Sequence, residues 1–228
     1  MWSELILGLD LAPGGEILMA GEGVAEIELP QGAGQRWSNG DLVVITRGDP
    51  PAESATILAS GLEANSMDLV ILRDAGGSHR RLPKVLREAY RVLKPGGGLL
   101  MTELNAEALL DSTPQHYLQR LLSQAHPHVG EYLLDTHPAA LDFAIEVVRA
   151  GFKDADSYSL DFPLGHFDDY QAHTDFVAVD GWRGLDRLSV DDRDLFLLDL
   201  PDLVSRVVPG DSFFDLEPIT VARGFKPV

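Results

Sequence analysis

The alternation of apolar and polar positions is clearest in one stretch of the first half of the chain. Residues Met67 to Leu72 form an apolar run broken by a single aspartate, which is typical of a strand buried on both faces of a parallel sheet. From Leu82 to Leu93, apolar residues recur at i, i+3, i+4 and i+7 opposite a basic stripe, and this spacing predicts an amphipathic helix. Lys94 to Gly98 end that helix, because proline cannot continue it and glycine accepts a left-handed cap. A second strand follows at Leu99 to Leu104, so the pattern predicts a βαβ unit with parallel strands.

The pattern before this unit favours strands and turns over helices. Val24 to Leu29 alternates in the manner of a strand, and Pro30 to Gly40 is rich in glycine and turn formers. We place a further strand at Asp41 to Thr46. Asp49 to Ser54 leaves little room for a crossover helix, so the N-terminal half is predicted to be trimmed of helices.

The pattern after the unit is mainly helical. Amphipathic spacing predicts helices at Ala106 to Ala125, at Pro138 to Gly151, where Gly151 is the expected cap, and at Ser189 to Val208. The segment from Leu164 to Asp186 is aromatic and acidic. We therefore expect one domain over residues 1–228, with a helical C-terminal cap or insertion over residues 164–210.

The residues of the βαβ unit also resemble a known family. The wording S-M-D-L-V-I-L followed by L-R-E-A-Y-R-V-L-K-P-G-G-G-L-L resembles the fourth strand, crossover helix and fifth strand of class I S-adenosylmethionine-dependent methyltransferases of the type 11-like group. Leu5 to Gly23 is similar to the family's lead-in helix and first strand with its G-x-G loop. The family's last helix and last two strands are resembled by Ala139 to Phe152, Ala155 to Phe162 and Ile219 to Phe225, respectively. The resemblance implies an α/β fold with a doubly wound, mostly parallel sheet of the seven-stranded type, a Rossmann-like fold.

The chain departs from the family pattern where the cofactor is held. Gly21 and Gly23 are kept, but the acidic residue that usually precedes the first loop is Met19, and Ala25 replaces the third glycine. The acid that accepts hydrogen bonds from the ribose at the end of the second strand is also missing, since Thr46 and its neighbour Arg47 stand there. The resemblance therefore implies S-adenosylmethionine as cofactor, with a degenerate first motif.

Ligands of open α/β sheets bind beyond the carboxyl ends of the strands, which places the candidate site. The candidate cofactor-binding residues near these ends are Ala20, Gly21, Gly23, Arg47, Asp49, Leu62 and Glu63. Asp74 and His79 flank the loop after the fourth strand and are the candidate catalytic residues, where a carboxylate or imidazole can accept a proton from the methyl acceptor. Other interpretations stay open: His79 as an exposed loop residue or helix cap, and the glycines as parts of a tight turn.

Composition limits the partners of the chain. Among 228 residues, 36 Asp and Glu oppose 18 Lys and Arg, and the formal charge of −18 disfavours nucleic acids and anionic membranes. The absence of cysteine excludes disulfides and thiolate chemistry. No run of some twenty apolar residues is found, so we expect a cytoplasmic protein. Because the negative charge disfavours polyanions, we expect it to act on a small molecule.

A histidine-rich segment is weighed as a metal site. His166, Asp168, Asp169 and His173 could bind a divalent metal, but their spacing matches no established site, and we favour a solvated acidic loop. Trp182 could wall a substrate pocket or pack in a core. We expect no metal.

Two functions remain. The first is S-adenosylmethionine-dependent methyl transfer to a small molecule. The second is a non-catalytic methyltransferase-fold protein that has lost cofactor binding and acts as an interaction or regulatory module.

Overall fold

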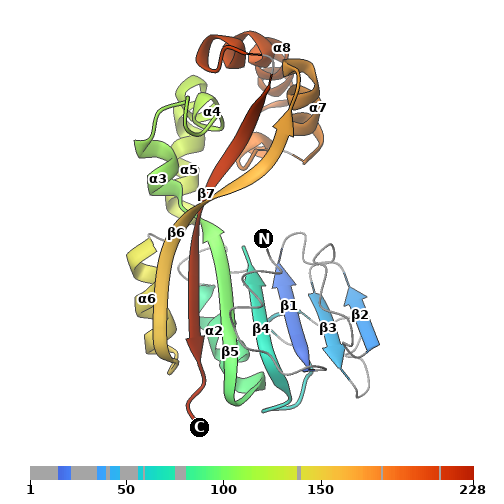
Figure 1. Cartoon of the computed structure of the whole chain (residues 1–228), viewed down its shortest axis with the longest axis vertical. Helices are drawn as coiled ribbons and strands as arrows, with labels where there is room; N and C mark the ends of the chain where they lie inside the picture. Colours follow the sequence, from blue (N-terminus) through green and yellow to red (C-terminus); the bar gives the residue numbers. More distant parts are fainter. Residues whose placement is uncertain are drawn as a thin grey trace. The chain divides into compact units, whose positions relative to one another are not determined.

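Seven strands form one sheet in the computed structural model of the chain, which describes residues 15–21, 35–39, 42–46, 56–58, 60–74, 81–137, 140–180, 182–210 and 212–228. The order across the sheet is β2-β3-β1-β4-β5-β7-β6 (Figure 1). The strands are β1 (Ile17–Gly21), β2 (Gln35–Asn39), β3 (Leu42–Thr46), β4 (Met67–Arg73), β5 (Leu93–Leu104), β6 (Lys153–Phe167) and β7 (Phe213–Phe225). In Figure 1, β7 runs in the opposite direction to its neighbours β5 and β6. The predicted α/β fold is confirmed.

The βαβ unit is present as the sequence predicts. β4 pairs in parallel with β5, with Leu69 opposite Gly98 and Arg73 opposite Thr102, and it also pairs in parallel with β1. The helix between them, α2 (Leu82–Val92), buries its apolar face completely, and each such side chain contributes roughly 1.5–3 kcal/mol of hydrophobic stabilisation. β5 begins directly after α2, earlier than predicted, and the ladder is irregular between Met67 and Leu69.

The other side of the sheet differs from the family pattern. A strand at Leu42–Thr46 is confirmed, but β3 pairs with β1 antiparallel rather than in parallel, and β2 pairs antiparallel with β3. The register brings Asn39 opposite Leu42, so only a two-residue connection separates β2 from β3. Such a short connection allows a hairpin, whereas a parallel pair needs a crossover of about a dozen residues or more. The mostly parallel sheet is therefore realised only around β1, β4 and β5.

The remaining helices follow the predicted segments with two differences. They are α3 (Ala106–Asp111), α4 (Arg120–Ala125), α5 (Pro127–Thr136), α6 (Ala140–Arg149), α7 (Tyr170–Asp180) and α8 (Val190–Val207), with a short 3-10 turn at Leu185–Arg187. The single helix predicted over 106–125 is split, because Pro114 cannot donate the backbone hydrogen bond that would continue α3. Pro127 begins α5, a helix that the sequence pattern did not predict.

Gly151 ends the α6 segment as predicted. Its φ of 101° lies in the left-handed region that favours glycine. A side chain there would also approach the ring of Tyr90 to 3.2 Å.

Residue contacts divide the chain into two compact units, each with its own core. The first unit comprises Met1–Glu103, Ala140–Tyr158 and Thr220–Val228; the second comprises Leu104–Ala139 and Ser159–Ile219. The core of the first unit is mainly aliphatic, and that of the second contains many aromatic side chains. The predicted single domain with a cap over 164–210 stays a prediction. No helix of the described residues is long and apolar enough to cross a bilayer.

Candidate functional site

The carboxyl ends of three adjacent strands of the first unit form the candidate site. The register places Gly21 of β1 opposite Arg73 of β4, and Arg73 opposite Thr102 of β5. The amide of Asp74 continues this row by donating a hydrogen bond to the Thr102 carbonyl at 2.9 Å. In open α/β sheets, this is the edge at which ligands bind. The sequence-predicted residues Gly21 and Asp74 are thus brought to the same edge.

Asp74 has an unusual backbone conformation at the end of β4. Its φ is 51°, in the left-handed region that residues other than glycine seldom adopt, at a cost of roughly 1–2 kcal/mol. Its side chain is 9% exposed, and one carboxylate oxygen lies 4.0 Å from Nε of Arg73, at the limit of an ion pair. Asn65 and Asp154 adopt the same conformation elsewhere in the structure, so this backbone geometry does not by itself mark a site. A carboxylate there can accept a hydrogen bond or a proton from a ligand.

Glu103 is a carboxylate of the same edge that the sequence reasoning missed. It follows Thr102 in β5 and is 1% exposed. The signal was present, since Glu103 is the one charged residue of the run L-L-M-T-E-L, which forms the buried end of β5. Charged side chains are rarely buried without a specific reason, so an acid in such a run merits attention.

The other predicted residues near this edge are only partly described. Ala20 is 1% exposed in β1. Gly23, Arg47, Asp49 and His79 lie outside the described residues. The antiparallel register nevertheless sets Ile45 of β3 opposite Ile17 at the start of β1, so the end of β3 that leads to Arg47 and Asp49 lies at the opposite edge.

Leu62 and Glu63 are also placed away from the site. The Leu62 carbonyl accepts a hydrogen bond of 2.7 Å from Arg91, in the last turn of α2, and the Glu63 carbonyl accepts one of 2.7 Å from Ser66. The Ser66 amide in turn donates to the carbonyl of Val92. Since α2 ends where β5 begins, these residues lie at the amino edge of the sheet. The Leu62 side chain packs against the aliphatic core there.

Charged residues at the amino edge have a structural role. Nζ of Lys94 lies 2.9 Å from a carboxylate oxygen of Asp68 and 3.3 Å from one of Glu16, which links the first residues of β4 and β5 to the residue before β1. Burial acts to lower the pKa of Lys94, but the hydrogen bonds to Asp68 and Glu16 outweigh it and raise the pKa. The lysine therefore stays charged and holds three strands together.

The histidine-rich segment of the second unit forms no metal cluster among the described residues. His173 is fully buried in α7, and its Nε2 lies 3.0 Å from Oδ2 of Asp215. Trp182 donates a hydrogen bond of 2.8 Å to the same oxygen, so it packs in the core. His166 instead lies 2.6 Å from the hydroxyl of Ser212. Burial of His173 differs from the solvated loop that the sequence favoured.

The described residues fit S-adenosylmethionine in part. Ala20 and Gly21 at the end of β1 are small residues, as the close approach of the methionine part of this cofactor needs. Met19, at the position of the usual acid, is fully buried and offers no charge. The carboxyl end of β3 lies at the amino edge of β1. This strand therefore does not bring a ribose-binding acid to the carboxyl edge where Gly21 and Asp74 lie.

Comparison with known proteins gives one match by sequence. Residues 46–101 match the family described as "Methyltransferase domain". This segment includes β4, α2 and most of β5, so the resemblance seen in the sequence is confirmed there. No curated protein sequence matches the chain significantly.

Solved structures of low sequence identity are also similar. One is phosphoethanolamine N-methyltransferase 2 of Haemonchus contortus with S-adenosyl-L-methionine, at 17% identity over 75% of this chain and 36% of that chain, with a TM-score of 0.41. A second is a protein of Bacillus halodurans with a provisional assignment as a methyltransferase. It is 15% identical over 76% of this chain and 70% of that chain, with a TM-score of 0.43. The chain thus spans 36% of the length of the nematode protein.

Proposed function

We propose that this chain, a relative of the class I S-adenosylmethionine-dependent methyltransferases through its βαβ unit, transfers a methyl group from S-adenosylmethionine to a small molecule. The observation that carries the proposal is the match over residues 46–101 together with the parallel pairing of β1, β4 and β5. When bound, the cofactor supplies an electrophilic methyl group on a sulfonium sulfur. The acidic charge of −18 is consistent with a small acceptor rather than a polyanion.

The proposed roles of the chain's own residues follow from their positions. Ala20 and Gly21 would let the cofactor approach the backbone at the end of β1. Asp74 would orient the acceptor by accepting a hydrogen bond from its O–H or N–H group, with His79 as a second candidate for the acceptor's proton. Methyl transfer requires mainly alignment and exclusion of water, so few further catalytic side chains are needed.

The second candidate function is a scaffold that binds no cofactor. The observation that favours it is the antiparallel pairing of β3 with β1, which directs the end of β3 away from the candidate site. The buried Met19 in place of an acid points the same way. A fold can persist after its original site is lost.

Calorimetric titration of the full chain with S-adenosylmethionine and with S-adenosylhomocysteine separates the two functions. The methyltransferase predicts a dissociation constant on the order of micromolar, about −8 kcal/mol. Gly21→Trp should abolish the heat of binding, because the indole would fill the space at the end of β1. Asp156→Asn, on the exposed part of β6, is the matched control and should leave the affinity unchanged. Absence of heat at millimolar ligand would reject the enzyme and support the scaffold.

Asp74→Asn tests the acceptor side of the same site. The substitution keeps the size of the side chain and removes its charge, and Asn tolerates the left-handed backbone. We expect the affinity for S-adenosylmethionine to change less than about threefold, since the residue is proposed to face the acceptor, while methylation of acceptors falls by about 100-fold. A variant that loses cofactor binding instead would place Asp74 on the cofactor.

A further inference from the structure

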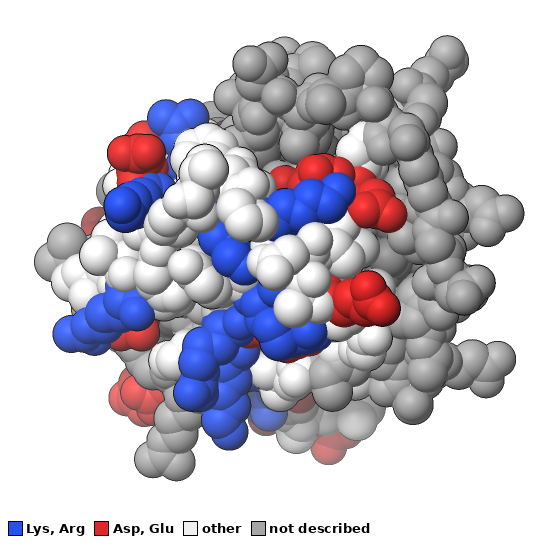
Figure 2. Space-filling model, turned by 90° about the horizontal axis from the view of Figure 1, so that it is seen from below, with Lys and Arg blue, Asp and Glu red and all other residues white. Residues whose placement is uncertain are grey.

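Charge is divided unequally between the two units. The second unit holds 18 of the 36 acidic residues but only 5 of the 18 basic ones, and the first unit holds the other 18 acidic and 13 basic residues. The second unit therefore has a formal charge of 5 − 18 = −13, whereas that of the first is 13 − 18 = −5. Lysine and arginine side chains gather in the middle of the face seen from below in Figure 2. The chain thus carries both a cationic and an anionic surface.

Helix α2 concentrates positive charge on its solvent face. Arg81, Lys84, Arg87 and Arg91 recur every three or four residues and are all exposed. Arg91 is neutralised by Glu88, with contacts of 2.7 Å to both carboxylate oxygens. Nε of Arg87 donates only to the carbonyl of Pro83, at 3.2 Å, and no carboxylate among the described residues pairs with it. Positive charge is in excess along this helix.

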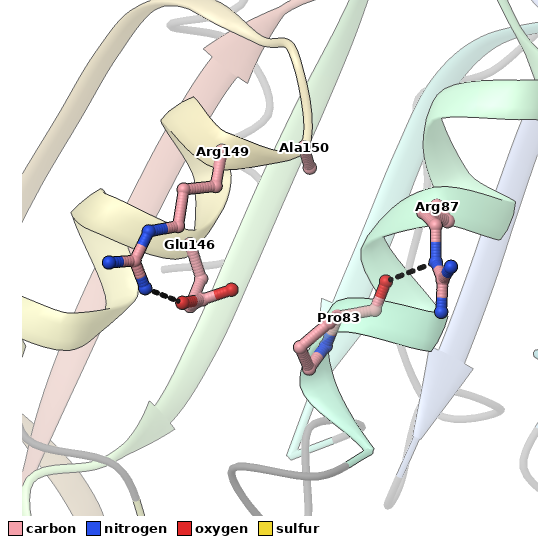
Figure 3. Close-up of a pocket in the computed structure, with 5 residues that line it drawn as sticks. All are labelled: Pro83, Arg87, Glu146, Arg149 and Ala150. Carbon is pink, nitrogen blue, oxygen red and sulfur yellow. Dashed lines mark hydrogen bonds and ion pairs between the residues drawn. The ribbon is translucent and has the colours of Figure 1, made fainter.

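A groove lies beside this charge, between α2 and α6. It has a volume of about 310 Å³ and is lined by Pro83, Arg87, Glu146, Arg149 and Ala150, which we call the basic groove (Figure 3). Arg149 pairs with Glu146 on the same helix, and Arg87 stands on the opposite wall. Next to the groove, Val148 and Ile145 of α6 are 58% and 37% exposed. The groove therefore offers the guanidinium of Arg87, and that of Arg149 paired with Glu146, beside an apolar surface.

Helix α8 of the second unit has the complementary character. Its residues Asp191, Leu195, Leu198 and Asp202 share one face by their spacing and are exposed, with Leu195 at 61% and Leu198 at 76%. The opposite face packs Phe196, Leu200 and Val204 into the core. We call the exposed face the acidic leucine stripe. Large exposed leucines flanked by carboxylates are typical of a helix that binds a basic, partly apolar groove.

We propose that the acidic leucine stripe of one copy of this chain docks into the basic groove of a second copy. The aspartates would pair with Arg87 and the neighbouring cations, and the leucines would cover the exposed apolar residues of α6. A nucleic acid or an anionic membrane fits less well, because the charge of −18 repels an extended polyanion. A short acidic helix, in contrast, contacts the basic groove without extending over the acidic remainder of the surface.

The expected association is weak and sensitive to salt. The 18 residues of α8 extend for about 27 Å, so the contact lies at the low end of protein interfaces, below about 1,200 Å² in total. Such interfaces give dissociation constants on the order of micromolar. Exposed charge pairs are screened as the Debye length falls from about 14 Å at 50 mM salt to about 4 Å at 500 mM.

Sedimentation velocity of the full chain tests the proposal. At 50 mM salt, the weight-average mass should rise above the 24.8 kDa of the monomer as concentration increases, and it should return toward the monomer at 500 mM salt. Arg87→Asp with Arg149→Asp should weaken association by at least about tenfold. Arg187→Asp with Arg223→Asp adds the same negative charge outside both the groove and α8, and it should retain association.

A charge exchange separates a specific contact from a folding defect. Asp191→Arg with Asp202→Arg, which reverses the charge of the stripe, should be monomeric alone, and so should the groove variant. A mixture of the two should associate, because the unaltered helix of the groove variant meets the unaltered groove of the helix variant, and the two reversed surfaces are complementary as well. A monomer at all concentrations in low salt would overturn the proposal. So would association that persists in the groove variant, or failure of the mixture when both variants melt as the wild type does.

Discussion

The two compact units are stabilised by different kinds of core. In the first unit, aliphatic side chains from β1, β4, β5 and α2 pack with Phe143 and are almost completely buried. In the second unit, aromatic side chains surround a buried polar network in which Asp215 contacts both His173 and Trp182. Apolar packing tolerates changes of shape better than loss of volume, whereas a buried charge depends on each partner. The first unit should therefore respond to volume and the second to hydrogen bonding.

The largest expected effect tests volume in the first unit. Phe143 of α6 is fully buried, and Phe143→Ala should lower the free energy of unfolding by about 3–5 kcal/mol through lost transfer energy and a residual cavity. Urea denaturation at neutral pH measures the change. Val148→Ala, on the exposed side of the same helix, should cost less than about 0.5 kcal/mol. Equal losses in the two variants would contradict the assignment of the core.

The next effect tests hydrogen bonding in the second unit. Asp215→Ala should cost about 3 kcal/mol, because the Trp182 indole and the His173 ring lose their shared acceptor while both stay buried. Asp215→Asn keeps an oxygen for one of these contacts and should lose less. Calorimetric melting compares the variants. If Asp215→Ala were as stable as the wild type, the network would contribute no stability and the contrast between the two cores would fail.

A smaller effect comes from an ionised group that links α2 to the segment before β4. Arg91, through its hydrogen bonds, lowers the pKa of Glu88; burial opposes this shift, and Ser60 adds to it. Because the folded pKa lies below the ordinary value of 4.5, the stabilisation is fully present above that pH and is lost as the pH falls through the folded value. Glu88→Gln should lose about 1 kcal/mol at pH 7. Urea melts should converge with the wild type in acid; a constant difference down to pH 3 would contradict the shift.

The sequence predicted those parts of the fold that depend on a local pattern of residues. The βαβ unit was predicted because its pattern is local: a buried strand, an amphipathic helix and a glycine turn follow one another between Met67 and Leu104. The antiparallel β3 was not predicted, because an apolar run such as L-V-V-I-T specifies a strand but not its direction. Direction depends on how neighbouring strands are connected, which the apolar run itself does not encode.

The positions of the candidate residues follow the prediction only where the strands are parallel. Gly21 and Asp74 lie at the carboxyl edge because β1 and β4 are parallel, as the family resemblance implied. Leu62 was assigned by its place in the chain, yet Arg91 binds its carbonyl at the other edge, a contact between residues 29 apart. The partners of His173 lie farther still, 42 residues away at Asp215. No local pattern encodes such pairings.

The smallest effect tests a local signal in the second unit, where most stabilising contacts are distant. Ser189 precedes α8, and its hydroxyl accepts a hydrogen bond of 3.1 Å from the Asp192 amide while donating one of 2.7 Å to the Asp192 carboxylate. Ser189→Ala should therefore cost about 1 kcal/mol, because an amide at the helix start loses its partner. Ser205→Ala removes a hydroxyl that donates to a carbonyl within the same helix, and alanine favours helices, so its cost should be below about 0.5 kcal/mol. Thermal melting measures both. If Ser205→Ala lowered the melting temperature more than Ser189→Ala, the hydrogen bonds of Ser189 would not be what stabilises the start of α8. Contacts between residues distant in sequence would then determine where this helix begins.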